Sequence, residues 1–293
     1  MTQDLKIWID GQLYSKDQAK ISVFDHGVLY GDGVFEGIRV YDGCIFRLRE
    51  HLERLWSSAH YLKLEIPMSY DGMVAALRET VRANGLKNGY IRLVVTRGIG
   101  DLGLDPRLCP RPTVFIIAAG IKMYPESDYE NGLEVITVPT NRINLSAFNA
   151  RVKSCNYINN IMAKMEGQLA NVREAIMLNQ DGFVVECTGD NVFIVKKGVL
   201  YTPPIYLGPL RGVTRDAIIE LAQADGMTVK EEPFTRFEVY DADEMFLTGT
   251  AAEAIPVVKV DGRLIGKGTP GEITKKLIAK FREIVSKDGV MVD

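Results

Sequence analysis

One lysine of this chain lies where its surroundings could make it a nucleophile. Lys153 falls in the segment Asn149–Tyr157, and apolar residues at helical spacing follow, so we expect it at the mouth of a helix with Ser154 as N-cap. Desolvation or nearby cations lower the pKa of a lysine, which can then form a Schiff base with an aldehyde. Arg142 and Arg151 could supply the positive field. These features predict that Lys153 anchors an aldehyde cofactor.

Groups that could bind such a cofactor occur elsewhere in the sequence. The turns Gly212–Asp216 and Gly249–Glu253 combine backbone N–H groups with threonine hydroxyls, and with Arg54 they could hold a phosphate. Glu186 ends an apolar segment, where a carboxylate needs a partner such as a pyridinium nitrogen or a local arginine. Tyr157 follows the lysine by about one helical turn, so its phenol could reach a ring oxygen. Together these are the parts that a pyridoxal phosphate enzyme requires.

Composition excludes several other functions. The chain has 293 residues, 46% of them hydrophobic and 25% charged, with a net charge of -3, as in a soluble globular protein. Basic clustering typical of nucleic-acid binding is missing, and the longest apolar run, Val114–Ile121, is far below the roughly 20 residues that span a bilayer. The four cysteines and three histidines show no metal or disulfide spacing. We therefore expect no metal, no membrane or nucleic-acid partner, no signal peptide and a cytoplasmic location.

One strand is expected to form a wall of the site. The segment Tyr30–Tyr41 contains three glycines, which favour close backbone approach, and then alternates between the two faces of a strand. One face carries Phe35, Gly37, Arg39 and Tyr41, and the other carries Val34, Glu36, Ile38 and Val40. The aromatic and arginine residues of the first face predict a pocket wall.

Apolar periodicity predicts the remaining elements. Helices are expected at 47–62, at 69–84, from about 209 to 225 and from 270 to about 287. Strands are expected within 6–14, 20–24, 90–96, 113–119, 133–138, 174–178, 183–186, 191–195, 199–202, 244–252, 256–260 and 263–265. Runs of strands with few helices predict an α+β fold. The polar segment 122–132 indicates a linker between a smaller domain, 1–121, and a larger one, 133–293.

Seven stretches, in the same order, resemble the branched-chain amino acid aminotransferases of the class IV (fold type IV) pyridoxal phosphate enzymes. They are Tyr30–Arg39, Arg49–Leu55, Tyr90–Arg92, Lys153–Tyr157, Glu186–Asn191, Gly212–Asp216 and Phe246–Glu253. The resemblance implies a smaller α/β N-terminal domain and a larger, mixed, β-barrel-like domain that binds pyridoxal 5'-phosphate. It also implies a homodimer or a larger assembly, with active sites near the interface.

The resemblance implies a role for each matching residue. Lys153 would form the internal aldimine and move the proton, Glu186 would pair with the pyridine nitrogen, and Tyr157 would bond the phenolic oxygen. Further cofactor contacts would come from Arg54, Leu210, Gly212, Val213, Thr214, Gly249 and Thr250. Substrate contacts would come from Phe35, Gly37, Tyr90, Arg92, Tyr124, Gly189, Thr250 and Ala251, with Tyr30 arriving from the partner subunit.

The activity implied is transamination of leucine, isoleucine and valine with 2-oxoglutarate by a ping-pong mechanism, in amino-acid biosynthesis. The chain departs from the family pattern at Ala119–Tyr124, where a tryptophan is common, at Cys187, where glycine is common, and in the loop Gly100–Pro106. These departures bear on substrate range more than on the reaction.

Four alternatives share the cofactor. D-amino acid aminotransferases carry an Arg-x-His carboxylate trap after the strand, whereas Arg97 is followed here by glycine and isoleucine. An (R)-amine transaminase activity leaves no signature in the sequence. Aminodeoxychorismate lyase has the same fold, but Arg92 and an apolar pocket argue against it. A non-enzymatic pyridoxal phosphate-binding protein would have no need of Lys153 and the other catalytic groups, all of which are present.

Overall fold

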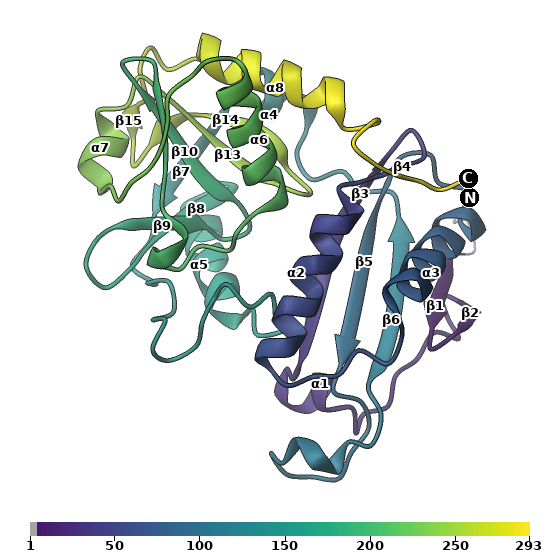
Figure 1. Ribbon diagram of the computed structural model, residues 1–293. Coiled ribbons are helices and arrows are strands. Elements are labelled where there is room, and N and C mark those ends of the chain that lie inside the picture. The colour runs from purple at the N-terminus through teal and green to yellow at the C-terminus, as the bar shows by residue number, and fades with distance from the viewer. Residues whose placement is uncertain (1–4) are drawn as a thin grey trace. The chain divides into compact units, whose positions relative to one another are not determined.

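The computed structural model describes residues 5–293, which form two compact units (Figure 1). The first unit contains the residues up to Ile121 together with two later segments, Val152–Asn156 and Val285–Asp293. The second unit contains Lys122–Arg151 and Tyr157–Ile284. The domain limits expected from the sequence stay a prediction; they would place both later segments of the first unit in the larger domain.

The first unit is built on an antiparallel sheet. Among the described residues the strand order is β16-β4-β3-β5-β6-β1-β2. The strands are β1 (Lys6–Ile9), β2 (Gln12–Ser15), β3 (Gly33–Tyr41), β4 (Cys44–Phe46), β5 (Gly89–Thr96), β6 (Thr113–Ala119) and β16 (Gly289–Met291). The predicted hairpin is confirmed, since Asp10 and Gly11 join β1 to β2. The predicted strand at 20–24 is wrong: Val23 and Phe24 are exposed, so no sheet partner buries their side chains.

Two amphipathic helices cover one face of this sheet. α2 (Leu48–Tyr61) and α3 (Tyr70–Ala83) pack their apolar sides against β3, β5 and β6, and the shared core contains Leu52, Leu55 and Ile38 (Figure 1). Ser69 caps α3 by accepting a hydrogen bond from the backbone of Gly72. Two short helices complete the unit, α1 (His26–Tyr30) and the 3-10 helix η1 (Pro106–Leu108).

The second unit contains a mixed sheet that curls. Its strands are β7 (Leu133–Thr137), β8 (Glu174–Leu178), β9 (Val184–Cys187), β10 (Asn191–Lys196), β11 (Val199–Thr202), β12 (Val229–Glu231), β13 (Glu244–Gly249), β14 (Glu253–Val260) and β15 (Arg263–Leu264). The order is β12-β11-β10-β13-β14-β7-β8-β9, with β15 on β14, and the pairs β7/β8, β7/β14 and β11/β12 are parallel. β9, at one end of this order, leads through a tight turn into β10 near the other end.

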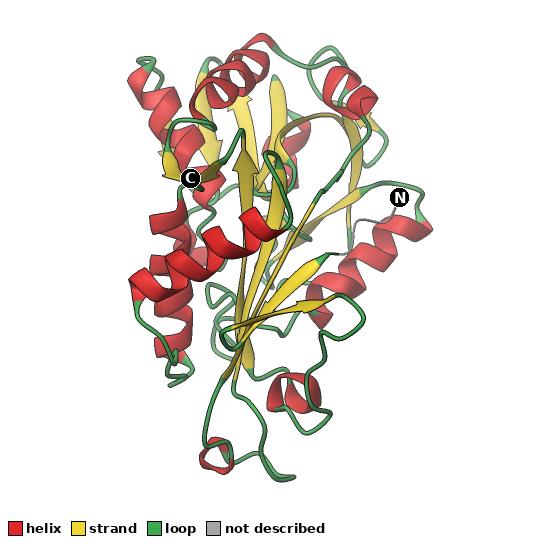
Figure 2. Cartoon of the chain, turned by 90° about the vertical axis from the view of Figure 1, so that its right-hand side faces the viewer, coloured by secondary structure: helices red, strands yellow, loops and turns green. Residues whose placement is uncertain are grey.

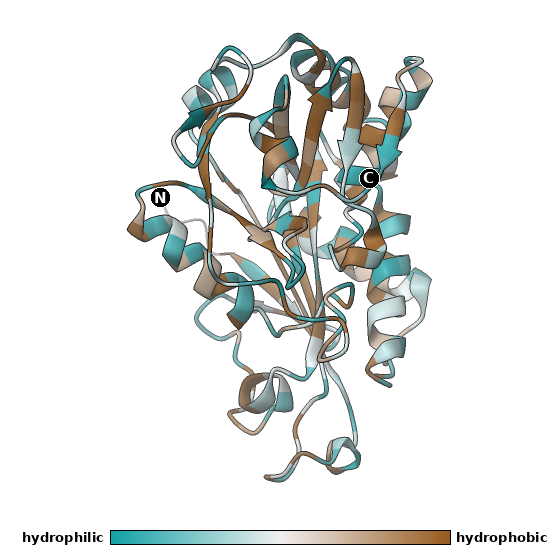
Figure 3. Ribbon diagram, turned by 90° about the vertical axis from the view of Figure 1, so that its left-hand side faces the viewer, coloured by the Kyte–Doolittle hydropathy of each residue, from teal (hydrophilic) through white to brown (hydrophobic). Residues whose placement is uncertain are grey.

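Helices of the second unit follow or connect these strands. They are α4 (Glu126–Asn131), α5 (Ile158–Leu169), η2 (Ile205–Leu207), α6 (Val213–Ala224), α7 (Arg236–Tyr240) and α8 (Glu272–Ile284). Both units therefore mix helices with largely antiparallel strands, which confirms the α+β prediction (Figure 2). Hydrophobic residues gather in the strands, as the sheet cores require (Figure 3). Within residues 5–293, none of the helices is both long and apolar enough to cross a membrane.

Candidate active site

The backbone around Lys153 is docked on strand β3 rather than placed at a helix start. The Lys153 carbonyl accepts a hydrogen bond from the Phe35 N–H at 3.0 Å, and the Cys155 N–H donates to the Gly33 carbonyl at 2.9 Å. Val34 and Ser154 form an isolated antiparallel bridge between these bonds. The extended backbone fixes where the lysine side chain leaves the chain.

The expected helix start is therefore wrong in detail. Helix α5 begins at Ile158 with Tyr157 as its N-cap, so Ser154 is not the cap, and Tyr157 does not lie one helical turn beyond Lys153. The reason is that the backbone at 153–155 hydrogen-bonds to β3, which requires extended rather than helical geometry. The Lys153 N–H also donates to the Ser58 hydroxyl at 3.1 Å.

The amino group of Lys153 has a pKa lowered to about 8. Desolvation is the main cause, the positive charge of Arg54 adds to it, and Glu36 partly opposes it. The Lys153 ammonium lies 4.7 Å from the centre of the Phe35 ring. The cations that lower this pKa are Arg54 and Arg92 of the same unit, in place of the expected Arg142 and Arg151. A lysine whose pKa lies near neutrality can act both as nucleophile and as proton carrier.

Arg54 is held by a buried carboxylate. Its Nε and Nη2 donate to the two oxygens of Glu36 at 2.7 and 2.8 Å, and His51 Nδ1 contacts Glu36 Oε2 at 2.8 Å. Burial alone would raise the pKa of Glu36, but Arg54 and His51 lower it to about 2. Burial lowers the pKa of His51. Sequence reasoning assigned neither Glu36 nor His51 to the site; the signal was a glutamate among Val34, Ile38 and Val40 on an apolar strand face.

The residues expected in the pocket wall lie together on β3 and β5. Gly37 pairs with Arg92 in the sheet, and Arg92 Nη2 donates to the Tyr90 hydroxyl at 3.1 Å. The Arg92 guanidinium also lies 4.5 Å from the centre of the Phe35 ring. A Cβ atom at Gly37 would lie only 2.0 Å from the Tyr90 hydroxyl. Glycine at 37 therefore makes room for the phenol that contacts Arg92.

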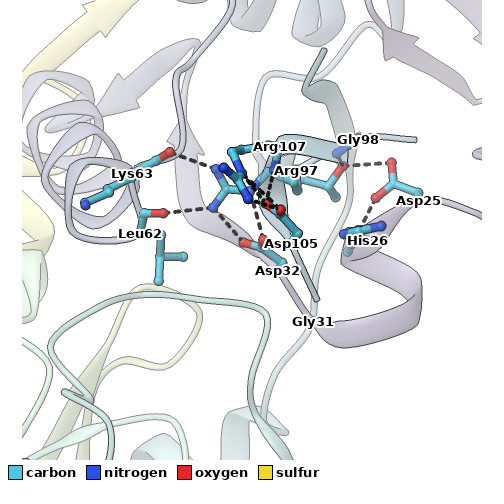
Figure 4. A network of polar contacts seen from close by, with 12 residues as sticks. Asp25, His26, Gly31, Asp32, Leu62, Lys63, Arg97, Gly98, Asp105 and Arg107 are labelled. Atoms are coloured by element: carbon cyan, nitrogen blue, oxygen red, sulfur yellow. Dashed lines mark hydrogen bonds and ion pairs between the residues drawn. The ribbon is translucent and has the colours of Figure 1, made fainter. Parts of the chain in front are cut away.

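Arg97, just after the end of β5, is held by hydrogen bonds to other residues of the first unit (Figure 4). Its guanidinium donates to both oxygens of Asp32 at 2.8 and 3.1 Å, and to the carbonyls of Leu62 and Lys63, each at 2.8 Å. Tyr30, expected to reach a neighbouring subunit, is half-exposed in α1. Its hydroxyl accepts a hydrogen bond from the Gly103 N–H at 3.0 Å.

In the second unit Glu186 is bound to a local arginine. Arg142 Nε donates to Glu186 Oε1 at 2.6 Å, and the Leu210 N–H donates to Oε2 at 3.0 Å. Arg142 is itself fixed by the side-chain oxygens of Asn159 and Asn160 at 3.0 and 3.2 Å. A carboxylate has about four lone-pair sites, so these two bonds leave Glu186 able to accept another. The local arginine that the sequence left open is thus present, and it does not prevent a pyridinium contact.

Two turns of the second unit bring small residues next to backbone N–H groups. Gly212 is the N-cap of α6, with Val213 and Thr214 in the first turn, and no side chain caps this helix start among the described residues. A helix start of this kind can bind an anion. Gly249 ends β13 and precedes Thr250 and Ala251; a Cβ atom at Gly249 would lie 1.9 Å from Asp190 Oδ1.

Tyr124 lies in the core of the second unit, where its hydroxyl donates to Asp190 at 3.5 Å. Burial raises the pKa of Tyr124, and burial followed by the charge of Glu174 raises the pKa of Asp190 to about 7. Gly189 is exposed in the turn before Asp190.

The expected site residues thus fall into two groups. One group belongs to the first unit: Tyr30, Phe35, Gly37, Arg54, Tyr90, Arg92 and Lys153. The other belongs to the second unit: Tyr124, Tyr157, Glu186, Gly189, Leu210, Gly212, Val213, Thr214, Gly249, Thr250 and Ala251. Their individual roles stay predictions.

Known proteins resemble this chain over nearly its whole length. The family described as "Amino-transferase class IV" matches residues 33–260. A Methanocaldococcus jannaschii protein, whose name gives it provisionally as a branched-chain-amino-acid aminotransferase, is 53% identical over 98% of this chain and 99% of its own. The branched-chain-amino-acid aminotransferase of Pseudomonas aeruginosa is 41% identical over 97% of this chain and 94% of its own.

Solved structures agree with this result. The branched-chain amino acid aminotransferase of Escherichia coli has a TM-score of 0.94 at 35% identity, over 98% of this chain and 96% of its own. The branched-chain aminotransferase of Thermoproteus uzoniensis with norvaline has a TM-score of 0.91 at 40% identity, over 97% of this chain and 95% of its own. The predicted fold type IV and enzyme class are confirmed. The chain belongs to the class IV aminotransferases, in the family of branched-chain-amino-acid aminotransferases.

Proposed function

We propose that this protein transfers the amino group of leucine, isoleucine or valine to 2-oxoglutarate, with pyridoxal 5'-phosphate as cofactor and Lys153 as its covalent anchor. The observation that carries the proposal is the desolvated amine of Lys153, whose pKa is lowered to about 8 beside Arg54. The names of the relatives support the substrate class.

The residues present fit the cofactor. An amine of lowered pKa suits an aldehyde, while Arg54 and the start of α6 suit a phosphate. Glu186 offers a carboxylate for a protonated ring nitrogen. When bound, the cofactor supplies an electron sink for the negative charge that develops at the substrate α-carbon.

The side chains of this protein would then do the remaining work. Lys153 would release the cofactor to the incoming amino group and, once free, move the α-proton. Arg92 would bind the substrate carboxylate, with Thr250 and Ala251 as further partners. Two half-reactions through the same site give a ping-pong scheme, in which 2-oxoglutarate enters after the first oxo acid has left.

Selection of aliphatic side chains would come from the wall of β3 and β5. Phe35 and Tyr90 present aromatic surface, and each methylene of the substrate in contact with such a wall contributes about 1–3 kcal/mol of discrimination. Arg97 argues against the D-amino acid alternative. Because its guanidinium already binds Asp32 and two carbonyls, it is unsuited to trapping a substrate carboxylate.

The absorbance spectrum of the purified protein tests this proposal. The cofactor bound to Lys153 should give a violet-absorbing band, which L-leucine alone should shift to the near ultraviolet and 2-oxoglutarate should restore. D-alanine is the matched control. A band that responds to D-alanine or to an (R)-amine, but not to L-leucine, would keep the fold and change the substrate class. If no band forms after addition of pyridoxal phosphate, Lys153 is not the anchor.

We also propose that the protein forms at least a homodimer. Apolar side chains are exposed around α1 and in the loop between β5 and β6, with Val28 at 55%, Leu102 at 71% and Leu104 at 81% exposure. Exposed apolar patches of this kind often mark interfaces. Sedimentation of the wild type and of a Leu104→Glu variant tests this: the wild type should sediment as a dimer or larger species, and the variant should dissociate more readily. A monomeric wild type would contradict it.

A further inference from the structure

Glu36 binds Arg54 from inside the protein. Its residue exposure is 0%, and its two oxygens accept from Arg54 Nε and Nη2. An arginine bound through two parallel N–H groups has a fixed plane as well as a fixed position. The pair therefore does more than neutralise charge, because it sets the direction in which the guanidinium faces.

The carboxylate is itself held rigidly. His51 Nδ1 contacts Glu36 Oε2 at 2.8 Å, and His51 is 1% exposed. Glu36 lies on β3 between Val34 and Ile38, which pack in the same core as Leu52 and Leu55 of α2. Strand and helix are thus joined by apolar contacts on both sides of the ionic cluster, which leaves the Arg54 side chain little freedom.

The cluster lies close to the reactive lysine. The charges of Glu36 and Arg54 act on Lys153, the charge of Lys153 acts on His51, and Phe35, next to Glu36, donates its N–H to the Lys153 carbonyl. The charged groups facing this region are Glu36 from β3, Arg54 and His51 from α2, and Arg92 from β5. β3 therefore fixes the backbone of Lys153 through Phe35 and the side chain of Arg54 through Glu36.

We propose that Glu36 is a positioning residue that holds Arg54 in the orientation in which it binds the cofactor phosphate. This inference rests on the proposed function. Glu36 does not touch the phosphate; it removes the need to order the long Arg54 side chain when the phosphate arrives. Preordering a side chain of this type improves affinity by up to about tenfold.

If only net charge mattered, removal of the Glu36 carboxylate would have the opposite effect on phosphate binding. A phosphate is attracted to positive charge, so loss of the Glu36 negative charge beside Arg54 should strengthen binding if only net charge mattered. Loss of positioning should weaken it. The sign of the change in the Glu36→Gln variant therefore separates the two explanations.

The measurement compares how tightly the protein, freed of cofactor, binds two aldehydes. Pyridoxal phosphate and pyridoxal present the same aldehyde to Lys153. The dissociation constant of pyridoxal divided by that of pyridoxal phosphate therefore reports the phosphate contribution, and we call this ratio the phosphate advantage. Equilibrium titration by fluorescence or absorbance gives both constants without any turnover. We expect Glu36→Gln to lower the phosphate advantage by about tenfold or more.

A double-mutant cycle shows whether Glu36 acts through Arg54. Arg54→Gln should lower the phosphate advantage, and adding Glu36→Gln to that variant should change the ratio no further. Asp288→Asn is the matched control, because Asp288 pairs with the buried Arg47 at 2.8 Å in the same unit; it should leave the ratio unchanged. If Glu36→Gln does not fold, Glu36→Asp replaces it, since it keeps the charge but withdraws the carboxylate by one methylene.

Each result has a definite reading. An unchanged or increased phosphate advantage in folded Glu36→Gln or Glu36→Asp overturns the proposal. It is also overturned if the effects of Glu36→Gln and Arg54→Gln on this ratio add in the double variant. If the wild type shows no preference for the phosphorylated aldehyde, the proposed cofactor function has failed, and this result is recognisable before any variant is made.

Discussion

Replacement of Gly37 by alanine should disable the contact between Tyr90 and Arg92 while leaving the protein folded. The added Cβ would lie 2.0 Å from the Tyr90 hydroxyl, whereas ordinary van der Waals contact begins at 3.4 Å. Tyr90 is only part-buried, so its ring can move, but the movement must break its 3.1 Å hydrogen bond from Arg92. A hydrogen bond to a charged group is worth about 1.5 kcal/mol or more. We therefore expect kcat/KM for L-leucine to fall about tenfold or more.

Stability should change much less than activity. Gly37 does not have a positive φ, so alanine can adopt its backbone conformation. The reduced freedom of the unfolded chain stabilises by about 0.4–1 kcal/mol, which offsets part of an overpacking cost of about 1–3 kcal/mol. Steady-state kinetics and thermal unfolding of the same preparation separate the two effects.

Two companion variants make the test specific. Gly120→Ala is the matched control, because apart from its two chain neighbours no described residue lies within 4 Å of the Cβ it would add. In a Tyr90→Ala background the clash no longer exists, so adding Gly37→Ala should cost nothing further. Wild-type kcat/KM in Gly37→Ala, or a further loss in the double variant, would refute the reasoning.

Three other predictions concern charged groups. Only the neutral amine of Lys153 attacks an aldehyde, and its pKa is about 8. The rate at which the cofactor-free protein reacts with pyridoxal should therefore rise about tenfold per pH unit up to about pH 8 and stay constant above it. A stopped-flow rate that still rises at pH 10 would contradict this. Glu186→Gln should lower the free energy of unfolding by about 3 kcal/mol in urea, since it leaves the Arg142 guanidinium buried without its carboxylate; unchanged stability would show that the pair contributes little. Arg97→Gln should lower the free energy of unfolding by a similar amount, because it loses the bonds to Asp32 and two carbonyls. The preference of the enzyme for L-leucine over D-alanine should stay the same. A changed preference would give Arg97 a direct role in the site.

Local patterns were sufficient for most elements of the fold. Helices α2 and α3 repeat an apolar pattern over 14 residues each, which identifies them without knowledge of their partners. The segment 20–24 shows the limit: its short alternation is typical of a strand, but a strand also needs a neighbour, and Val23 is 73% exposed. A pairing partner is not encoded within five residues.

The site was less predictable because its geometry depends on distant contacts. Ser154 has a good N-cap side chain, yet the hydrogen bonds between 153–155 and β3 determine the local structure instead. Glu36 carried a signal, a charge on an apolar strand face, but its partners Arg54 and His51 come from a separate helix. Sequence reasoning named candidate chemical groups such as Lys153 and Arg54, but it did not identify Glu36 and His51, which hold Arg54 in place.

The first unit also constrains when this protein can finish folding during synthesis. Strand β16 pairs with β4, and the 152–156 segment pairs with β3, so a sheet begun by the earliest residues is completed by two later segments. Arg47 and Arg78 likewise bind groups at Asp288 and Val292. While the ribosome is still translating, this sheet has incomplete edges, and contacts so distant in sequence form slowly. The contacts of Lys153 with β3 and α2 involve only residues up to Cys155 and can form first, whereas the edge of the sheet at β4 is completed last, once β16 has been made.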